Sequence, residues 1–167
     1  MLRRRELKVS WKLGEALPPS YDGGAVVSSV HVAQYAAPLR RELGEVLWVL
    51  MLDAGHRVLG HRELSSGGMR ATVCDPGEVA RVALLAGASA VVLVHNHPSG
   101  VVSPSPEDVT ATTRVAWVCR AVGITLLDHV IVAGGGAVGG HSSAKADGWL
   151  VTLSDTAARF GVAEVVA

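Results

Sequence analysis

The longest uninterrupted apolar run in the chain is Val46–Leu52, and it limits the folds that the chain can adopt. A membrane-spanning helix needs about 20 apolar residues, so this run is too short to cross a bilayer. Its length and its branched side chains favour a β-strand, extended to Glu45 and Asp53, that is buried on both faces. Residues 53–56 have the composition of a turn, and residues 57–64 return as a second strand. We therefore expect a β-hairpin whose first strand is buried.

Helix start signals divide the rest of the chain into helices and strands. Asp75-Pro76 and Ser105-Pro106 each place a capping side chain before a proline, which is typical of the first turn of a helix. Ser28 or Ser29 is expected to cap a third helix that Gly44 ends. The predicted helices are 28–43, 76–85 and 105–123, and the predicted strands are 45–53, 57–64, 90–94 and 125–132. Helices and strands alternate after the hairpin, so the expected fold class is α/β, with a mixed sheet flanked by helices.

Charge and cysteine content exclude several classes of protein. The chain has 15 Lys and Arg residues and 15 Asp and Glu residues, which gives a formal net charge of +0. Since duplex binding depends on clustered cations, we do not expect this domain alone to bind nucleic acid. Cys74 and Cys119 form no metal-binding pattern and suit a reducing compartment. No apolar segment follows residues 3–8, which are charged except for Leu7, so we expect no signal peptide, no membrane contact and a cytoplasmic location.

His95-Asn96-His97 follows the predicted strand 90–94 and carries the strongest chemical signal. Residues i and i+2 of a strand point to the same face, so both imidazoles can reach one metal ion. Asp108 falls in the first turn of the predicted helix 105–123, where the helix dipole favours a carboxylate. Two histidines and one carboxylate leave the fourth position of a tetrahedral zinc ion open, as in catalytic zinc sites. A water in that position would have its pKa lowered to about 7 and become a nucleophile.

Each of these features also has a purely structural interpretation. Most His-x-His pairs in proteins are ordinary strand-end residues, and Ser105-x-x-Asp108 can be a capping box and nothing more. The metal interpretation depends on their combination with the apolar strand before them and the Pro/Gly/Ser loop between them.

Three separate segments together resemble the JAMM metalloprotease motif of the JAB/MPN superfamily. They are Glu45, then His95-Asn96-His97, then Ser105-x-x-Asp108 after seven intervening residues. The segments His97-Pro98-Ser99-Gly100 and Pro104-Ser105, and the later segment 126–132, are similar to the RadC branch in particular. The resemblance covers residues 28–143. It implies a cytidine-deaminase-like MPN fold that carries one zinc ion per chain.

The resemblance also implies a role for each residue of the motif. The zinc ligands would be His95, His97 and Asp108. Glu45 would be the general base, and Ser105 would donate a hydrogen bond to the tetrahedral oxyanion. The implied reaction is hydrolysis of a peptide or isopeptide amide by a metal-bound water, with the proton passed on to the leaving amine.

Two other polar residues are interpreted as structural. Glu63 is a rival general base, because the predicted hairpin returns it to the end of the sheet where Glu45 lies. We favour its interpretation as a solvated charge on the returning strand. His129 follows Asp128 in the predicted strand 125–132, and we expect a buried hydrogen bond there rather than a metal ligand.

The chain is expected to contain one domain with two extensions. These are an N-terminal extension or linker, 1–24, the RadC-like JAB/MPN domain, 25–143, and a C-terminal extension packed on or near the domain, 144–167. The chain departs from the RadC pattern at Gly67-Gly68-Met69, and at Val101 and Val102. These departures concern the cleft edge, so they affect the expected substrate more than the expected metal.

Two alternative functions remain open from the sequence. The RadC resemblance also suggests a DNA-repair-associated protein or a metal-dependent nuclease, and some MPN domains are interaction modules without a metal. The balanced charge argues against DNA binding, and the complete set of motif residues argues against a module without catalysis. The expected partner is therefore a peptide or isopeptide substrate, and the high apolar content is compatible with a homodimer.

Overall fold

The computed structural model describes residues 10, 12, 16–19, 21–66, 74–134 and 140–150. The helices are α1 (Ser29–Tyr35), the 3-10 helix η1 (Ala37–Arg41), α2 (Pro76–Ala86) and α3 (Pro106–Ala121). The strands are β1 (Val46–Leu52), β2 (Val58–Ser66), β3 (Ala90–His97), β4 (Thr125–Ala133) and β5 (His141–Ser143). Most of the predicted extension 1–24, the segment Gly67-Gly68-Met69 and residues 151–167 lie outside the described residues.

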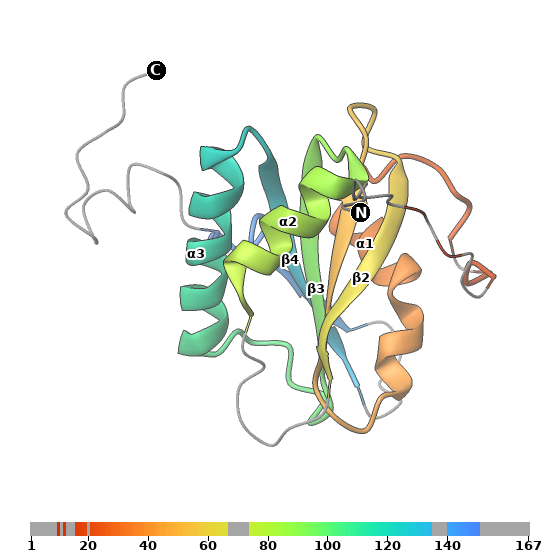
Figure 1. Ribbon diagram of the computed structural model, residues 1–167. Coiled ribbons are helices and arrows are strands. Elements are labelled where there is room, and N and C mark those ends of the chain that lie inside the picture. Colours follow the sequence, from red (N-terminus) through yellow and green to blue (C-terminus); the bar gives the residue numbers. More distant parts are fainter. Residues whose placement is uncertain are drawn as a thin grey trace, which may run out of the picture.

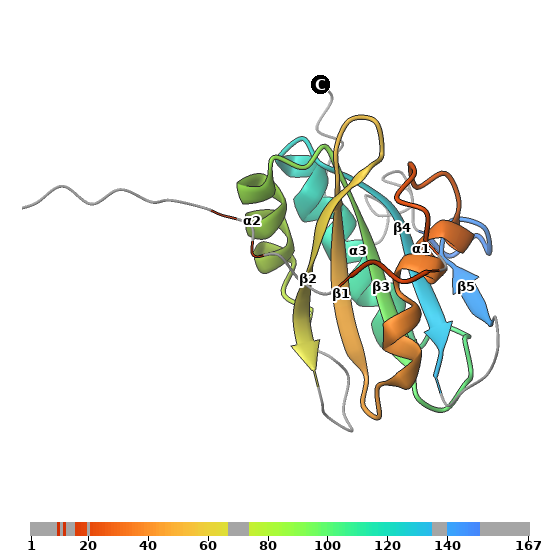
Figure 2. The ribbon, with the colours of Figure 1, turned by 90° about the vertical axis from the view of Figure 1, so that its right-hand side faces the viewer.

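The described strands form a mixed sheet in the order β2-β1-β3-β4-β5 (Figure 1). β1 pairs antiparallel with both β2 and β3, whereas β3 and β4 are parallel and are connected through α3. Figure 2 shows α2 and α3 on one side of the sheet and α1 on the other. The predicted hairpin and the predicted mixed sheet flanked by helices are therefore confirmed.

An apolar core covers each face of the sheet, as the run Val46–Leu52 predicts. Leu50 and Leu52 of β1 pack on the side of α1, whereas Val49 and Met51 pack on the side of α2 and α3. Alternate residues of a strand point to opposite faces, so the position of a residue along β1 or β3 determines which side it faces.

The predicted helix 28–43 is interrupted after its second turn. α1 ends at Tyr35, and after Ala36 the chain continues as η1, which has Pro38 in its first turn. Proline lacks an N–H, its ring clashes with the carbonyl of the residue four positions earlier, and it disfavours the helical conformation of the preceding residue. The prediction of one continuous helix is therefore wrong at Pro38.

Two strands differ from the prediction. β3 continues beyond residue 94 to His97, so both histidines of the motif lie within a strand. β5 was not predicted, because a strand of 3 residues after a glycine-rich segment shows no alternating pattern. None of the described helices is both long enough and apolar enough to cross a membrane.

The parallel pair β3–β4 ends in a close approach of two backbones. The N–H of Gly134 donates to the carbonyl oxygen of His97 over 2.9 Å. A Cβ atom at position 134 would lie 2.8 Å from the Cα of Pro98 and 2.9 Å from the carbonyl oxygen of His97. Only glycine fits such a contact, and the contact fixes the backbone from which the His97 side chain leaves β3.

Candidate metal centre

β3 and α3 bring three potential metal ligands together at the carboxyl end of β3. His95 pairs with Leu47 of β1, so its side chain faces the side of α2 and α3, and His97 faces the same side. Asp108 lies in the first turn of α3, after the loop that follows β3. Each of the three residues offers a ligand atom, and these atoms all lie within 4.8 Å of one another.

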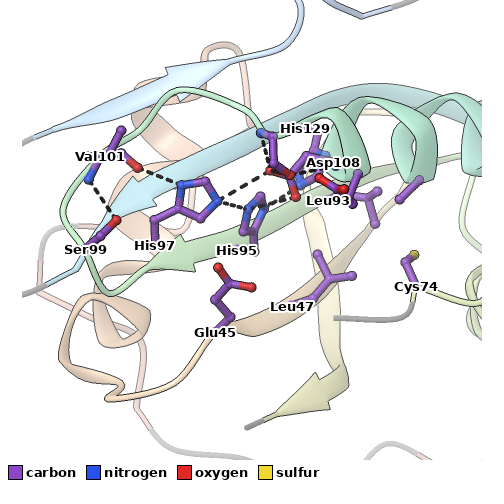
Figure 3. A pocket seen from close by; sticks show the side chains of 13 residues that line it. Glu45, Leu47, Cys74, Leu93, His95, His97, Ser99, Val101, Asp108 and His129 are labelled. Atoms are coloured by element: carbon purple, nitrogen blue, oxygen red, sulfur yellow. Dashed lines mark hydrogen bonds and ion pairs between the residues drawn. The ribbon is translucent and has the colours of Figure 1, made fainter. Parts of the chain in front are cut away.

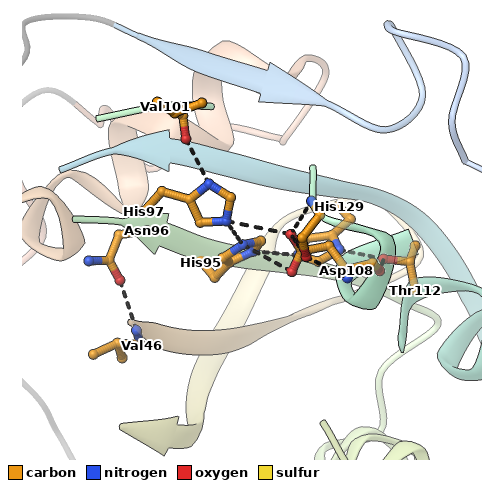
Figure 4. A network of polar contacts seen from close by, with 9 residues as sticks. Val46, His95, Asn96, His97, Val101, Asp108, Thr112 and His129 are labelled. Carbon is orange, nitrogen blue, oxygen red and sulfur yellow. Dashed lines mark hydrogen bonds and ion pairs between the residues drawn. The ribbon is translucent and has the colours of Figure 1, made fainter. Parts of the chain in front are cut away.

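The ligand atoms face a common centre (Figure 4). The Nε2 atoms of His95 and His97 are 2.8 Å apart. Asp108 Oδ1 lies 3.3 Å from His95 Nε2, and Asp108 Oδ2 lies 3.5 Å from His97 Nε2. His97 Nδ1 is 2.7 Å from the carbonyl oxygen of Val101, to which it donates. Neutral His97 therefore keeps its proton on Nδ1 and turns the lone pair of Nε2 toward the centre.

Ser105 and Asp108 form a capping box at the start of α3. Ser105 Oγ accepts from the Asp108 N–H over 3.1 Å. Asp108 Oδ2 accepts from the Ser105 N–H over 2.8 Å and from the Ser105 hydroxyl over 2.7 Å. The cap occupies Oδ2 and directs Oδ1 toward His95. The structural and the metal interpretation of this motif are therefore compatible, since the cap orients the carboxylate.

Burial and hydrogen bonding set the charge of the ligand side chains. Burial lowers the pKa of His95 to about 4, so this ring is neutral near pH 7. Burial would raise the pKa of Asp108, but hydrogen bonds from His97 and Ser105 outweigh it and hold that pKa well below its usual range. The hydrogen bond with Asp108 in turn raises the pKa of His97. An ionised Asp108 that favours a proton on His97 would equally favour a metal cation at the same place.

The three side chains line a cavity of about 490 Å³ (Figure 3). In Figure 3 the carboxylate of Glu45 enters this cavity and points toward His95 and His97. Its charge adds to that of Asp108 in raising the pKa of His97. The structure therefore gathers all the residues of the predicted motif in one cavity, Ser105 included. Their neighbours in its lining are Leu47, Cys74, Leu93, Ser99, Val101, Glu107, Ala111 and His129.

Asn96 connects β3 to the backbone on both sides of Glu45. Its side chain is 0% exposed and points to the sheet face opposite His95. Asn96 Oδ1 accepts from the Val46 N–H over 2.8 Å, and Asn96 Nδ2 donates to the carbonyl oxygen of Gly44 over 2.9 Å. The backbone pairing of β1 with β3 ends one residue after Val46, so the Asn96 side chain extends it and holds the start of β1.

Glu63, the rival general base, lies on the other face of the sheet. The register of β1 and β2 pairs Glu63 with Trp48, which packs on the side of α1. Glu45 lies two residues before Leu47, so its side chain points to the same face as that of Leu47, toward α2 and α3, and away from the face of Trp48. Glu63 is exposed, as expected for a solvated charge, and does not line the cavity.

Behind His95 lie two polar residues, His129 and Thr112, and the sequence analysis singled out only His129. His129 Nε2 lies 2.8 Å from His95 Nδ1, and Thr112 Oγ1 lies 2.5 Å from His129 Nδ1. His129 thus makes a buried hydrogen bond, as expected. Thr112 could have been found only from its position four residues after Asp108, on the same face of α3. Trp149 lies against His129, with 5.5 Å between the ring centroids.

The donor set fits a divalent transition metal. Imidazole nitrogens suit zinc, copper, iron and nickel, and a single carboxylate completes a common three-residue ligand set. The cavity on the remaining side leaves a position for water or substrate, as in catalytic sites and unlike closed structural sites. The described residues could therefore hold one metal ion between β3 and α3.

Comparison with known proteins identifies the same part of the chain. The family model described as "RadC-like JAB domain" matches residues 26–149. A UPF0758 protein of Coprothermobacter proteolyticus is 43% identical over 98 residues, which cover 59% of this chain and 42% of that protein. A UPF0758 protein of Marinomonas sp. is 40% identical over 109 residues, which cover 65% and 49% of the two chains. The chain thus spans less than half the length of both relatives.

Proposed function

This chain belongs to the RadC-like JAB domain family, and we propose that it is a zinc-dependent hydrolase of amide bonds, of the peptidase or isopeptidase type. The observation that carries the proposal is that His95, His97 and Asp108 share one cavity with Glu45. Two imidazoles and a carboxylate suffice to bind a metal, but Glu45 adds a group that can move a proton. Together they supply a metal site and a proton-transfer group, both of which metal-dependent hydrolysis of an amide needs.

The ligand atoms would be His95 Nε2, His97 Nε2 and Asp108 Oδ1. The chemistry that a bound zinc ion supplies at such a site is polarisation of a carbonyl group and acidification of water. Glu45 would accept a proton from the water that attacks the carbonyl carbon. It would then deliver this proton to the amide nitrogen as the C–N bond breaks, which yields a carboxylic acid and an amine.

Ser105 would stabilise the oxyanion that forms on the attacked carbonyl. Its hydroxyl lines the cavity and donates to Asp108 Oδ2. If the hydroxyl turned toward a substrate, Oδ2 would still accept from the Ser105 N–H over 2.8 Å. The cap can therefore release the hydroxyl to a developing negative charge without leaving this carboxylate oxygen unpaired.

We further propose a peptide or isopeptide as the substrate. Leu47, Leu93 and Ala111 provide an apolar lining beside the acidic groups, which suits an amide with an aliphatic neighbour. Cys74 and Cys119 are buried free thiols, which supports a reducing, cytoplasmic location. We also propose a homodimer as the oligomeric state, because 49% of the residues are hydrophobic.

Metal content and hydrolysis test the proposal directly. The full chain is purified, supplied with zinc, freed of excess metal and measured by elemental analysis. We expect about one zinc ion per wild-type chain and none in the variant His95→Ala/His97→Ala. His141→Ala is the matched control, because His141 contacts Ser29 away from the cavity, and it should keep its zinc.

Hydrolysis is then measured on a fluorescence-quenched peptide library and on lysine-isopeptide conjugates. The zinc-loaded wild type should cleave members of one of these sets, and the double variant none. A wild type that takes up no zinc would contradict the proposal, and so would a zinc-loaded chain that cleaves neither set.

A further inference from the structure

A chain of hydrogen bonds runs behind His95 and ends on the backbone of another ligand residue. His95 Nδ1 contacts His129 Nε2 over 2.8 Å, and His129 Nδ1 contacts Thr112 Oγ1 over 2.5 Å. Thr112 Oγ1 in turn contacts the carbonyl oxygen of Asp108 over 2.5 Å. This series of hydrogen bonds therefore connects β3, β4 and α3 and joins two of the three potential ligand residues (Figure 4).

The direction of each hydrogen bond follows from the Asp108 carbonyl. A carbonyl oxygen can only accept, so the Thr112 hydroxyl must donate its single proton to it. Thr112 Oγ1 then has no proton left for His129, and it must accept from His129 Nδ1. His129 therefore carries a proton on Nδ1.

Burial removes the remaining ambiguity. His129 is 2% exposed and contacts a hydroxyl group and another imidazole, neither of which carries a negative charge, so burial favours the neutral ring. A neutral imidazole has one N–H, which leaves His129 Nε2 as an acceptor. The hydrogen bond with His95 must then be donated by His95 Nδ1. His95 then has its proton on Nδ1 and turns the unprotonated Nε2, which a metal-binding imidazole needs, toward His97 and Asp108.

We propose that Thr112 and His129 are positioning residues, which lock His95 in the tautomer that presents the Nε2 lone pair to the metal. The inference rests on the proposed metal centre and adds to it two residues that touch no metal. Val101 does the same for His97 through a backbone carbonyl, so each imidazole has its own acceptor behind it. Such partners orient a ligand and raise its basicity, and their loss weakens metal binding.

Zinc affinity in Thr112 variants of the full chain tests this proposal. Thr112→Val keeps the shape of the side chain but removes the hydroxyl, so it should weaken zinc binding about 10- to 100-fold in competition with a chromophoric chelator. Thr112→Ser restores the hydroxyl and should bind zinc within about threefold of the wild type.

Thr113→Val is the matched control for this series. Thr113 is also buried in α3, and its hydroxyl donates to the Val109 carbonyl over 2.8 Å without reaching a histidine. It should leave zinc affinity within about threefold of the wild type. Equal affinity of Thr112→Val and the wild type would overturn the proposal, and so would an equal loss in Thr112→Val and Thr113→Val.

Nitrogen-15 chemical shifts of the histidine rings give a second measurement that needs no catalysis. In the full chain before zinc is added, we expect protonated Nδ1 and unprotonated Nε2 in both His95 and His129. In Thr112→Val, the signal of His129 should shift toward the other tautomer. A wild-type His129 protonated on Nε2 would overturn the proposal.

The two measurements separate this inference from the proposed function. A wild type that bound no zinc would contradict the proposed function, while the ring shifts would still decide the tautomer. A wild type that bound zinc and cleaved amides, with an unchanged Thr112→Val, would contradict only the positioning role.

Discussion

Asp108 and Glu45 are two of the carboxylates that line the cavity, and their positions suit them to different tasks. Asp108 is held by Ser105 and faces both imidazoles, which suits a ligand that must stay ionised and in place. Glu45 enters from the start of β1 and points toward the same imidazoles (Figure 3). At the scale of single residues, Glu45 is therefore the group proposed to move the proton.

Replacing Glu45 should separate metal binding from hydrolysis. Glu45→Gln keeps the size of the side chain but removes its basicity, so it should retain one zinc ion and lose about 100- to 10,000-fold in kcat. Glu63→Gln is the control, because Glu63 lies on the other face of the sheet, and it should keep full activity. Zinc content and cleavage of the best library substrate are measured for both. A fully active Glu45→Gln would refute the role of Glu45.

At the scale of the elements, β3 serves the site from both of its faces. His95 and His97 point to the side of α2 and α3, while Asn96 between them points the other way and binds the backbone of Gly44 and Val46. One strand thus places two potential ligands and also holds the backbone on both sides of Glu45. This arrangement follows from the period of two residues in a strand.

Truncation of Asn96 should displace Glu45, the proposed general base, and leave metal binding unchanged. Asn96→Ala leaves the Val46 N–H and the Gly44 carbonyl unpaired, so it should lower stability by about 1–3 kcal/mol and lower kcat at least about tenfold. Zinc content should stay at one ion per chain. The measurements are denaturant unfolding, elemental analysis and kcat at a temperature where the variant is folded.

Val92→Ala controls for the loss of stability alone. Val92 is buried in β3 on the same face as Asn96 but contacts the apolar core rather than the start of β1. It should be destabilised by an amount of the same order and keep kcat close to the wild-type value. If Asn96→Ala and Val92→Ala lost kcat equally, the contact with the neighbours of Glu45 would have no specific role.

At the scale of the whole molecule, the balance of 15 basic and 15 acidic residues bears on the nuclease alternative. Binding to a polyanion without a net positive charge requires a local cluster of cations. We expect the full chain to leave a heparin column below about 0.2 M salt. Glu42→Lys/Glu63→Lys, in which each substitution raises the net charge by two, should elute later and calibrates the column. Retention of the wild type beyond about 0.5 M salt would favour a nucleic-acid partner.

Local sequence patterns predict most of the helices and strands and the residues of the candidate site. The apolar run Val46–Leu52 predicts a strand buried on both faces. The capping residues before α2 and α3, with the prolines at their first positions, predict where those helices begin. His95 and His97 share a face because they are two residues apart in a strand. These properties depend on neighbours within a few residues, so a local pattern is enough to reveal them.

How these parts meet depends on strand register and on the packing of the helices on the sheet. The register of β1 with β2 puts Glu63 on the face opposite Glu45, and an irregularity between Leu47 and Trp48 contributes to that register. The packing of α3 on β3 and β4 brings Thr112 to His129 and Asp108 to His95. Register and packing join residues far apart in the chain, and no local pattern records them. The sequence therefore predicted the side chains of the motif. The fold placed Glu45 rather than Glu63 in the cavity and brought Thr112 and His129 behind the potential ligands.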